Sequence, residues 1–354
     1  MSLENVERPK SRNAVLIFTD ENYAPAAYFV AQQALRALDG SADVVVATSD
    51  VTTRSLIAQT DPRLRAIGFP SDLLPVSLPV RVSRPRILYA RLVLDRLVGT
   101  DYDRVIYLDC DIWICSKDFA RLFELEMRGN AIAAVRDAHD LVPDAQLRWT
   151  ERIPGGRRRH CTYSEYKARL GLGPQDHYFN SGVLLVDVAK YRSEDIGGRA
   201  LSWVTGPDFM GPWHDQSGLN YAVKGKFSEI SLLWNWQASL QDQQTSVSSG
   251  AKVLHFSGRS KPWNDYLGRL NPIYASMMRS ELGNTPWPKF VRSASEVGPW
   301  TYRFPRYIKH RVLLGPSATG LHRRRLAAAK AYLASGRFAD VEQGLVGCCG
   351  EMIG

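Results

Sequence analysis

RVIYLDCDIWI, residues 104–114, places two carboxylates inside an otherwise apolar run. Asp109 and Asp111 have hydrophobic residues on both sides, and only Cys110 separates them. An unpaired carboxylate at the rim of a hydrophobic core is strongly unfavourable. The rest of the sequence must therefore explain what compensates these two negative charges.

Continuous apolar runs of strand length recur along the chain. They are AVLIFT (14–19), DVVVATS (43–49), Val105–Leu108, AIAAV (131–135) and VLLVDV (183–188). Helical spacing links Tyr28 to Leu38, and a second helix is expected over Pro85–Val98, which Gly99 follows. Because the strands lack alternation, both of their faces should be buried, as in a parallel sheet covered by helices. The pattern predicts a doubly wound α/β sheet.

Carboxylates lie just beyond three of these runs, at Asp20, Asp109 and Asp137. Ligands of open α/β sheets bind at the carboxyl ends of the strands. Two residues apart on extended backbone, Asp109 and Asp111 should point the same way and together hold a divalent cation. Hard oxygen ligands suit Mg²⁺ or Mn²⁺, which also bind phosphates. An Asp-x-Asp pair in an exposed turn is the alternative, and the pair alone does not decide between them.

Five stretches of the sequence carry motifs in a fixed order. They are FTDENYAPA (18–26), YARL (89–92), YLDCDIWI (107–114), HYFNSGVLLVD (177–187) with WHDQSGLN (213–220), and HFSGRSKPW (255–263). From about Ala14 to Trp263 the chain resembles glycosyltransferase family 8. Members of this family are retaining, nucleotide-sugar-dependent transferases with a GT-A-type, Rossmann-like α/β fold, and they include lipopolysaccharide galactosyl- and glucosyltransferases. The resemblance implies a catalytic domain over residues 12–284.

The resemblance also implies which residues bind the UDP-sugar: Asp20, Asn22, Tyr23, Arg91, Asp109, Cys110, Asn180, Ser181, Gly258 and Lys261. Within this set, Asp20 would bind the edge of the uracil and Tyr23 would stack on its face. Gly258 would let the backbone approach the diphosphate, and Lys261 would supply positive charge to it. The alternative for this last segment is a helix beyond the sugar site, with Lys261 exposed.

The position of Arg91 can also be interpreted without the resemblance. It shares one helical stripe with Ile87, Leu94 and Val98. A buried cation on that stripe requires an anionic partner. The alternative is a surface arginine of which only the aliphatic part is buried.

A metal ion, Mn²⁺ or Mg²⁺, would be bound by Asp109, Asp111 and His255 if the resemblance holds. His255 follows an apolar segment, where a lone histidine is more often a packed core residue than a ligand. The carboxylate pair upstream, and Gly258 and Lys261 downstream, favour the ligand.

The catalytic candidates implied by the resemblance are Gln216, Asp215 and Asp137. Asp137 would face the acceptor, and the donor-sugar pocket would be lined by Asn180, Ser181, Asp215 and Gln216. Many relatives have alanine where this chain has Ser181, so the choice of sugar stays open. For Asn180, the alternative is a turn residue ahead of the following strand.

The mechanism implied depends on what lies beneath the anomeric carbon. A double displacement needs a carboxylate there. In the family an amide, here Gln216, takes that position, and an amide is a poor nucleophile. Same-face attack is therefore expected, with the leaving phosphate oxygen taking the proton of the acceptor hydroxyl. Asp215 remains as the alternative nucleophile.

The reaction implied is retaining transfer of galactose or glucose from a UDP-sugar to an acceptor hydroxyl. The expected acceptor is a lipopolysaccharide-core or other glycolipid saccharide. One alternative is a nucleotidyltransferase-like metal enzyme on the same fold, which typically has a Gly-rich phosphate loop that residues 18–26 lack. The other is a nucleic-acid-binding protein that uses the basic C-terminal residues. Because it leaves the acidic pair unexplained, no nucleic acid partner is expected.

Positive charge is concentrated towards the C-terminal end. Lys and Arg outnumber Asp and Glu by 45 to 36, and Val297–Ala339 contains no acidic residue. Its basic residues are Arg303, Arg306, Lys309, Arg311, Arg323, Arg324, Arg325, Lys330 and Arg337, and its interleaved aromatic residues are Trp300, Tyr302, Phe304 and Tyr307. Residues 285–354 are therefore expected to form a basic helical extension that contacts the anionic inner surface of a membrane or the acceptor. A solvated basic tail is the alternative.

Three features of the sequence predict a cytoplasmic protein, peripheral on the cytoplasmic face of the membrane. The first residues are polar and lack the apolar segment of a signal peptide. No apolar run approaches the ~18–20 residues that span a bilayer. Five cysteines without regular spacing, an odd number, indicate a reducing compartment.

Overall fold

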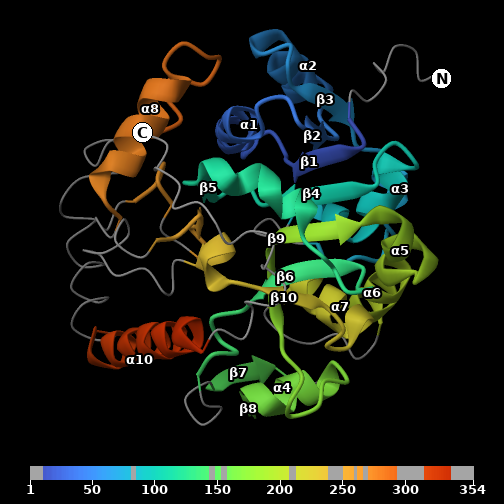
Figure 1. Cartoon of the computed structure of the whole chain (residues 1–354), viewed down its shortest axis with the longest axis vertical. Coiled ribbons are helices and arrows are strands. Elements are labelled where there is room, and N and C mark those ends of the chain that lie inside the picture. Colours follow the sequence, from blue (N-terminus) through green and yellow to red (C-terminus); the bar gives the residue numbers. More distant parts are fainter. Residues whose placement is uncertain are drawn as a thin grey trace.

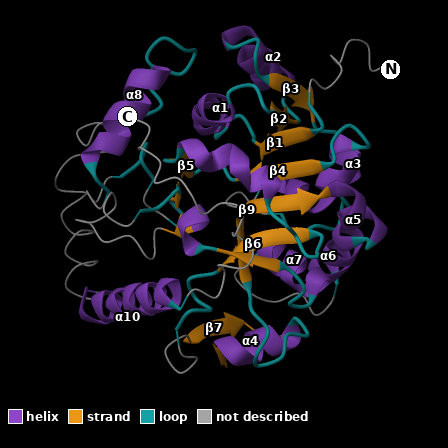
Figure 2. Ribbon diagram, viewed as in Figure 1, coloured by secondary structure: helices purple, strands orange, loops and turns teal. Residues whose placement is uncertain are grey.

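The computed structural model of the chain has an α/β architecture (Figure 1). It describes residues 11–80, 85–142, 148–152, 158–206, 213–237, 250–258, 261–265, 270–292 and 315–335. Figure 2 shows strands side by side through the middle of the molecule, with helices on the flanks.

The central sheet has seven strands in the order β10-β6-β9-β4-β1-β2-β3. Their bounds are β1 Asn13–Phe18, β2 Asp43–Thr48, β3 Arg65–Gly68, β4 Arg104–Leu108, β6 Ile132–Arg136, β9 Phe179–Asp187 and β10 Ser228–Ile230. Neighbouring strands are parallel except β9, which is antiparallel to both β4 and β6. The carboxyl ends of β1, β4 and β6 therefore lie at one edge of the sheet, together with the amino end of β9.

Helices cover both faces of this sheet (Figure 2). The α-helices are α1 Ala24–Leu38, α2 Val51–Thr60, α3 Leu94–Val98, α4 Tyr163–Arg169, α5 Val188–Ser193, α6 Ile196–Thr205, α7 His214–Val223, α8 Pro272–Leu282 and α10 Gly315–Ala334. The 3-10 helices are η1 Ser71–Leu73, η2 Arg86–Val93, η3 Lys117–Glu124 and η5 Leu232–Asn235. The helix predicted over Pro85–Val98 thus begins as a 3-10 helix and becomes α-helical only at Leu94.

Alternate residues of one strand enter two separate hydrophobic cores. In β1, Val15 and Ile17 belong to the core that includes α1, whereas Ala14 and Leu16 belong to the core that includes α5, α6 and α7. The continuous apolar runs therefore reflect burial on both faces, as expected. The predicted doubly wound α/β sheet is confirmed.

Two features of the sheet differ from the expectation. β9 begins at Phe179, ahead of the predicted start at Val183, and it runs antiparallel to its neighbours. Asn180 therefore lies within a strand and not in a turn before it. β3 and β10 were not predicted, because one is a half-buried edge strand and the other has only three residues.

A second sheet of three short strands lies beside the first. Its order is β11-β12-β5, with β11 Trp236–Gln237, β12 Val253–His255 and β5 Ile112–Ile114. Asp109 and Asp111 lie in the turn that carries the chain from β4 into β5, so the expectation of extended backbone through both carboxylates is wrong. The antiparallel register of β12 and β5 pairs His255 with Ile112. That register brings the imidazole next to the acidic turn.

The C-terminal helix α10, red in Figure 1, packs on the rest of the molecule. Ala329 and Tyr332 are buried in the core that contains α1. The Tyr332 hydroxyl donates to Glu229 of β10, and the Arg136 guanidinium lies 4.9 Å from the Tyr332 ring centre. The predicted aromatic residues and Arg303–Arg311 lie outside the described residues, so the membrane role of residues 285–354 stays a prediction. None of the described helices has both the length and the apolar character needed to cross a bilayer.

The contact of α6 with η2 leaves no room for a side chain at Gly197, whose Cβ would lie 2.2 Å from the Leu92 carbonyl oxygen. We expect Gly197→Ala to lower the free energy of unfolding by about 1–3 kcal/mol, as overpacking does. Urea unfolding followed by circular dichroism measures this. Gly198→Ala is the matched control, because its Cβ would meet only the exposed carboxylate of Asp195, which can move away. Because Gly→Ala by itself favours a helix, equal losses in both variants would contradict the role of this contact.

Candidate functional site

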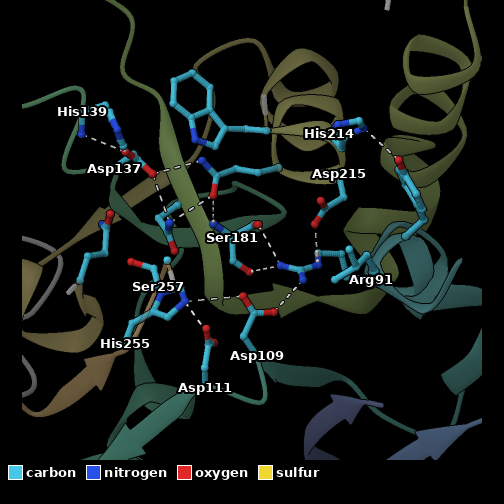
Figure 3. A pocket seen from close by; sticks show the side chains of 17 residues that line it. Arg91, Asp109, Asp111, Asp137, His139, Ser181, His214, Asp215, His255 and Ser257 are labelled. Carbon is cyan, nitrogen blue, oxygen red and sulfur yellow. Dashed lines mark hydrogen bonds and ion pairs between the residues drawn. The ribbon is translucent and has the colours of Figure 1, made fainter. Parts of the chain in front are cut away.

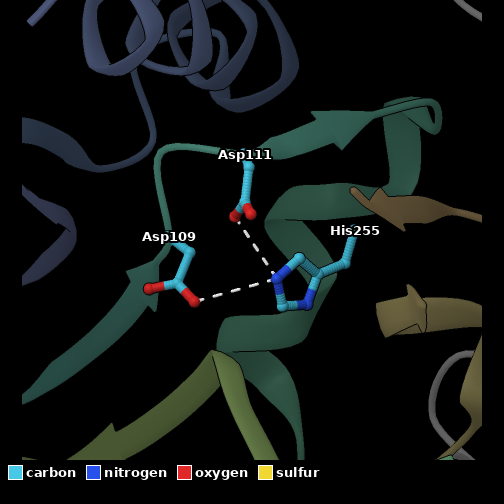
Figure 4. A group of neighbouring side chains, drawn as sticks. All are labelled: Asp109, Asp111 and His255. Carbon is cyan, nitrogen blue, oxygen red and sulfur yellow. Dashed lines mark ion pairs between the residues drawn. The ribbon is translucent and has the colours of Figure 1, made fainter. Parts of the chain in front are cut away.

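The turn between β4 and β5 forms a cluster with His255 (Figure 4). One ligand atom from each of Asp109, Asp111 and His255 lies within 4.8 Å of the others. His255 Nε2 is 3.3 Å from Asp111 Oδ1 and 3.8 Å from Asp109 Oδ2. Two carboxylates and an imidazole nitrogen that faces them are a donor set that fits a divalent cation. The structure thus brings together the three residues predicted to bind a metal ion.

Lys261 lies on the same side of the cluster as Asp111. Its ammonium group pairs with Asp111 Oδ2 and donates to the Phe256 carbonyl oxygen at 2.7 Å. Burial alone would raise the pKa of Asp111, but the charge of Lys261 and the interaction with His255 hold that pKa well below its usual range. The alternative with an exposed Lys261 is wrong, because only 13% of its side chain is exposed.

Arg91 compensates the other carboxylate of the pair. Its Nη2 donates to Asp109 Oδ1 at 2.6 Å, and its Nε lies 2.9 Å from Asp215 Oδ2. Its Nη1 donates to the carbonyl and hydroxyl oxygens of Ser181 at 3.0 and 2.9 Å. Burial lowers the pKa of Arg91, but Asp109 and Asp215 outweigh it and hold that pKa above its ordinary value. The anionic partners required for a buried Arg91 are these two carboxylates, and the surface alternative is wrong.

The opposite wall of the site is a hydrogen-bond network centred on Asn180. Its Oδ1 accepts from the Gly182 N–H at 3.0 Å and from Asn235 Nδ2 at 2.9 Å. Its Nδ2 donates to Asp137 Oδ2 and to Gln216 Oε1, both at 3.1 Å. A side-chain amide has two acceptor lone pairs and two donor hydrogens. All four are therefore used within the protein.

Asp137 and Gln216 complete this network. Gln216 Nε2 donates to Asp137 Oδ2, and Gln216 Oε1 accepts from the Ser181 N–H, each at 3.1 Å. The other Asp137 oxygen is 2.7 Å from His139 Nδ1. Burial would raise the pKa of Asp137, but His139 and the hydrogen bonds it accepts hold that pKa well below its usual range. Asp137 is therefore an ionised carboxylate that only accepts hydrogen bonds.

Both walls line one cavity of about 560 Å³ (Figure 3). Of the residues predicted to form the site, those that line it are Arg91, Asp109, Asp111, Asp137, Asn180, Ser181, Asp215, Gln216, His255 and Gly258. Gly258 has φ +102°, a left-handed conformation that favours glycine. The predicted residues Asp20, Asn22, Tyr23, Cys110 and Lys261 are not part of this lining.

The predicted nucleotide-contacting residues lie at the start of α1. Asp20 Oδ1 accepts from the N–H groups of Asn22 and Tyr23, both at 3.0 Å, which orders the turn into the helix. The Tyr23 ring is 43% exposed and meets Trp263 edge-on at 6.0 Å, so part of it is free to stack. The Cys110 thiol contacts the Phe18 carbonyl oxygen at 3.2 Å, and burial raises its pKa. Their roles towards a nucleotide stay predictions.

Several residues of the site were not predicted from the sequence. His139 and Trp213 line the cavity, with ring centres 5.0 Å apart. Asn235 is buried behind His255, and Tyr107 donates to Asp109 Oδ1 at 2.5 Å. A signal existed only for Asn235, which is a polar residue within the apolar run LLWNW.

The motifs and the geometry agree with one family of known proteins. The family model described as glycosyl transferase family 8 matches residues 14–266, more than half of the chain. The chain belongs to glycosyl transferase family 8. The resemblance inferred from the five motifs is therefore confirmed.

Family 8 relatives include enzymes of lipopolysaccharide synthesis. The lipopolysaccharide 1,2-glucosyltransferase of Escherichia coli (strain K12) is 26% identical over 221 residues, which cover 59% of this chain and 58% of that protein. The lipopolysaccharide 1,3-galactosyltransferase of Salmonella typhimurium (strain LT2) is 26% identical over 219 residues, which cover 60% of this chain and 58% of that protein. This chain thus spans less than two thirds of the length of these relatives.

Solved structures of glycosyltransferases share the fold of this chain. The galactosyltransferase LgtC has a TM-score of 0.60 and 21% identity, and the similarity covers 78% of this chain and 98% of LgtC. The bifunctional glycosyltransferase WbbM has a TM-score of 0.62 and 20% identity, covering 80% of this chain and 51% of that chain. They confirm the predicted GT-A-type fold of this family 8 protein.

Removal of the charge of the buried Arg91 should destabilise the folded chain, because two partly buried carboxylates lose their counter-ion. We expect Arg91→Met to lower the free energy of unfolding by about 3–5 kcal/mol. Burial raises the pKa of Asp215 even with Arg91 in place, so the loss should be severe. Arg96→Met, at an exposed position on α3, is the control and should stay within about 0.5 kcal/mol of wild type in guanidinium unfolding. A wild-type stability for Arg91→Met would contradict the assigned ion pairs.

Proposed function

We propose that this chain is a retaining hexosyltransferase that moves galactose or glucose from a UDP-sugar to a hydroxyl of a saccharide acceptor. The expected acceptor is a lipopolysaccharide-core or other glycolipid saccharide. The observation that carries the proposal is the cavity, which has the cluster Asp109, Asp111 and His255 on one wall and the Asn180 network on the other. Relatives that transfer glucose or galactose to lipopolysaccharide support it.

The cluster wall suits a diphosphate leaving group. A divalent cation held by Asp109, Asp111 and His255, Mn²⁺ or Mg²⁺, would supply positive charge against the negative charge that gathers there. Lys261 adds a further positive charge on the same side, because its ammonium group lies against Asp111. Gly258 has no Cβ and leaves the backbone beside them open. These features favour cleavage of the bond between sugar and diphosphate.

The network wall supports attack on the same face of the sugar. Gln216 Oε1 accepts two hydrogen bonds, from Asn180 Nδ2 and the Ser181 N–H, and an amide oxygen so engaged is a weak nucleophile. Asp215, the other candidate nucleophile, is paired with Arg91. The leaving phosphate oxygen would then take the proton of the acceptor hydroxyl. Trapping of a glycosyl–enzyme on Asp215 would instead establish a double displacement.

The class of reaction is tested by incubation of the purified full chain with a panel of UDP-sugars and Mn²⁺, scoring UDP release and the second product. We expect UDP from UDP-galactose or UDP-glucose, together with free or transferred hexose. Treatment with a chelator should abolish the release, and added Mn²⁺ should restore it. Transfer of the nucleotide itself would show a nucleotidyltransferase, and release unchanged by chelation would contradict a cation at the cluster.

Asp111 is the carboxylate on which this chemistry depends most directly. We expect Asp111→Ala to lower turnover of the UDP-sugar at least ~10²-fold, because ~1.4 kcal/mol of lost transition-state stabilisation is tenfold in rate and a metal contributes several kcal/mol. Asp72→Ala, at an exposed carboxylate in η1, is the matched control and should keep wild-type turnover. Circular dichroism checks that both variants fold. Turnover of Asp111→Ala within a few-fold of wild type would refute the role.

The proposal extends to attachment at the cytoplasmic face of a membrane through residues 285–354. Each Lys or Arg near an anionic surface contributes about 1 kcal/mol. We therefore expect replacement of Arg303, Arg306, Lys309 and Arg311 by Gln to weaken binding to phosphatidylserine vesicles by more than ~10²-fold in a sedimentation assay. Replacement of the three arginines by Lys keeps the charge and should keep binding. UDP-sugar hydrolysis should not change, and equal binding of both variants would defeat this extension.

A further inference from the structure

Asn235 lies behind the cavity lining and contacts one residue of each wall, His255 and Asn180. It ends η5 and is fully buried. Its Oδ1 lies 2.9 Å from His255 Nδ1, and its Nδ2 donates to Asn180 Oδ1 at 2.9 Å. A buried amide between an imidazole and a second amide can act only by fixing how each of them is oriented.

The direction of each hydrogen bond follows from groups that have a single role. The Gly182 N–H can only donate, so the oxygen of Asn180 must face it. The ionised carboxylate of Asp137 can only accept, so the NH₂ group of Asn180 must face Asp137. The Asn180 oxygen therefore receives the NH₂ group of Asn235, and the Asn235 oxygen is left to face His255. The Gly182 N–H and the Asp137 carboxylate thus each fix the same orientation of the Asn180 amide.

The consequence for His255 is a defined tautomer. Since Asn235 Oδ1 accepts, His255 Nδ1 carries a hydrogen, and Nε2, which faces Asp109 and Asp111, is the nitrogen left to bind a cation. Gly182 sets the position of the same ring: a Cβ there would lie 2.3 Å from His255 Cε1 and 2.7 Å from Nδ1. The imidazole occupies space that exists because residue 182 has no side chain.

We propose that Asn235 is a positioning residue that makes His255 a metal ligand, by accepting the Nδ1 hydrogen and holding Nε2 towards the two carboxylates. Asn180 is the next member of this chain of hydrogen bonds, so the orientation of His255 is set by the network on the sugar side. The inference rests on the proposed metal-dependent transferase function. It adds Asn235 and Gly182 to the residues that determine cation affinity.

The test is Mn²⁺ affinity of the purified full chain without UDP-sugar, measured from the electron paramagnetic resonance signal of free Mn²⁺. Asn235→Leu removes the acceptor at similar volume and should weaken binding about 10–100-fold, as loss of the partner of a metal-bound histidine does. Asn235→Asp keeps an acceptor for Nδ1 but loses the donor to Asn180 Oδ1, and it should bind Mn²⁺ more tightly than Asn235→Leu. Gly182→Ala, which displaces the ring, should weaken binding about 10-fold or more.

Gln32→Met is the matched control, because it also replaces a buried amide, which donates to Asp61, and neither residue lines the cavity. Its Mn²⁺ affinity should equal wild type. Rescue by Asn235→Asp separates a tautomer effect from a general packing defect, and thermal unfolding without Mn²⁺ shows which variants are folded. If Asn235→Leu and wild type bind Mn²⁺ equally, or if folded Asn235→Asp binds as weakly as Asn235→Leu, the inference is wrong while the proposed function stands. If wild type binds no Mn²⁺, the cation site and this inference fail together.

Discussion

Two carboxylates at the boundary between two sheets are the constraint around which this molecule is arranged. Arg91 lies against Asp109, and Lys261 lies against Asp111. Each cation comes from a distant segment and is itself largely buried, so neither can leave without stranding an uncompensated charge. His255 then lies between the two carboxylates, brought there by the register of β12 with β5. Compensation of the two carboxylate charges thus brings η2, the small sheet and the segment after β12 together at Asp109 and Asp111.

The direction of β9, antiparallel to β4 and β6, decides which residues lie next to this carboxylate pair. The Asp137 N–H donates to the Tyr178 carbonyl oxygen, and the Asp109 N–H donates to the Gly182 carbonyl oxygen, both at 2.9 Å. The start of β9 therefore bridges the carboxyl ends of β6 and β4. A parallel β9 would place this segment at the opposite edge of the sheet. The register between β6 and β9 also shifts here, where Val135 pairs with Asn180, an irregularity of the kind that re-aims side chains beside functional sites.

Much of the fold and of the candidate site could be predicted from short segments, because a buried strand and a charge at its end are properties of a few adjacent residues. The direction of β9 could not, since VLLVDV fits a strand of either direction when both faces are buried. Extended backbone was expected through Asp109 and Asp111, with an exposed turn as the alternative, because these few residues fit either conformation. His255 and Gln216 were assigned by family resemblance and not by pattern. Asn235 has its role only because η5, β9 and β12 meet, and a single amide in an apolar run does not reveal that.

The two walls of the cavity differ in how they can respond to a substrate. In the network wall, the hydrogen-bonding groups have partners within the protein before any ligand binds. Asn180 uses both of its donor hydrogens and both of its acceptor lone pairs, and Asp137 accepts from Asn180, Gln216 and His139. A buried network with its members satisfied is rigid, and rigid groups hold a reacting centre in place. On the cluster wall, Arg91 and Lys261 contact one oxygen of each carboxylate, and the other oxygens, Asp109 Oδ2 and Asp111 Oδ1, face His255, where a divalent ion can bind. The proposed same-face transfer would use this combination, because the sugar would have to stay fixed while negative charge departs on the diphosphate.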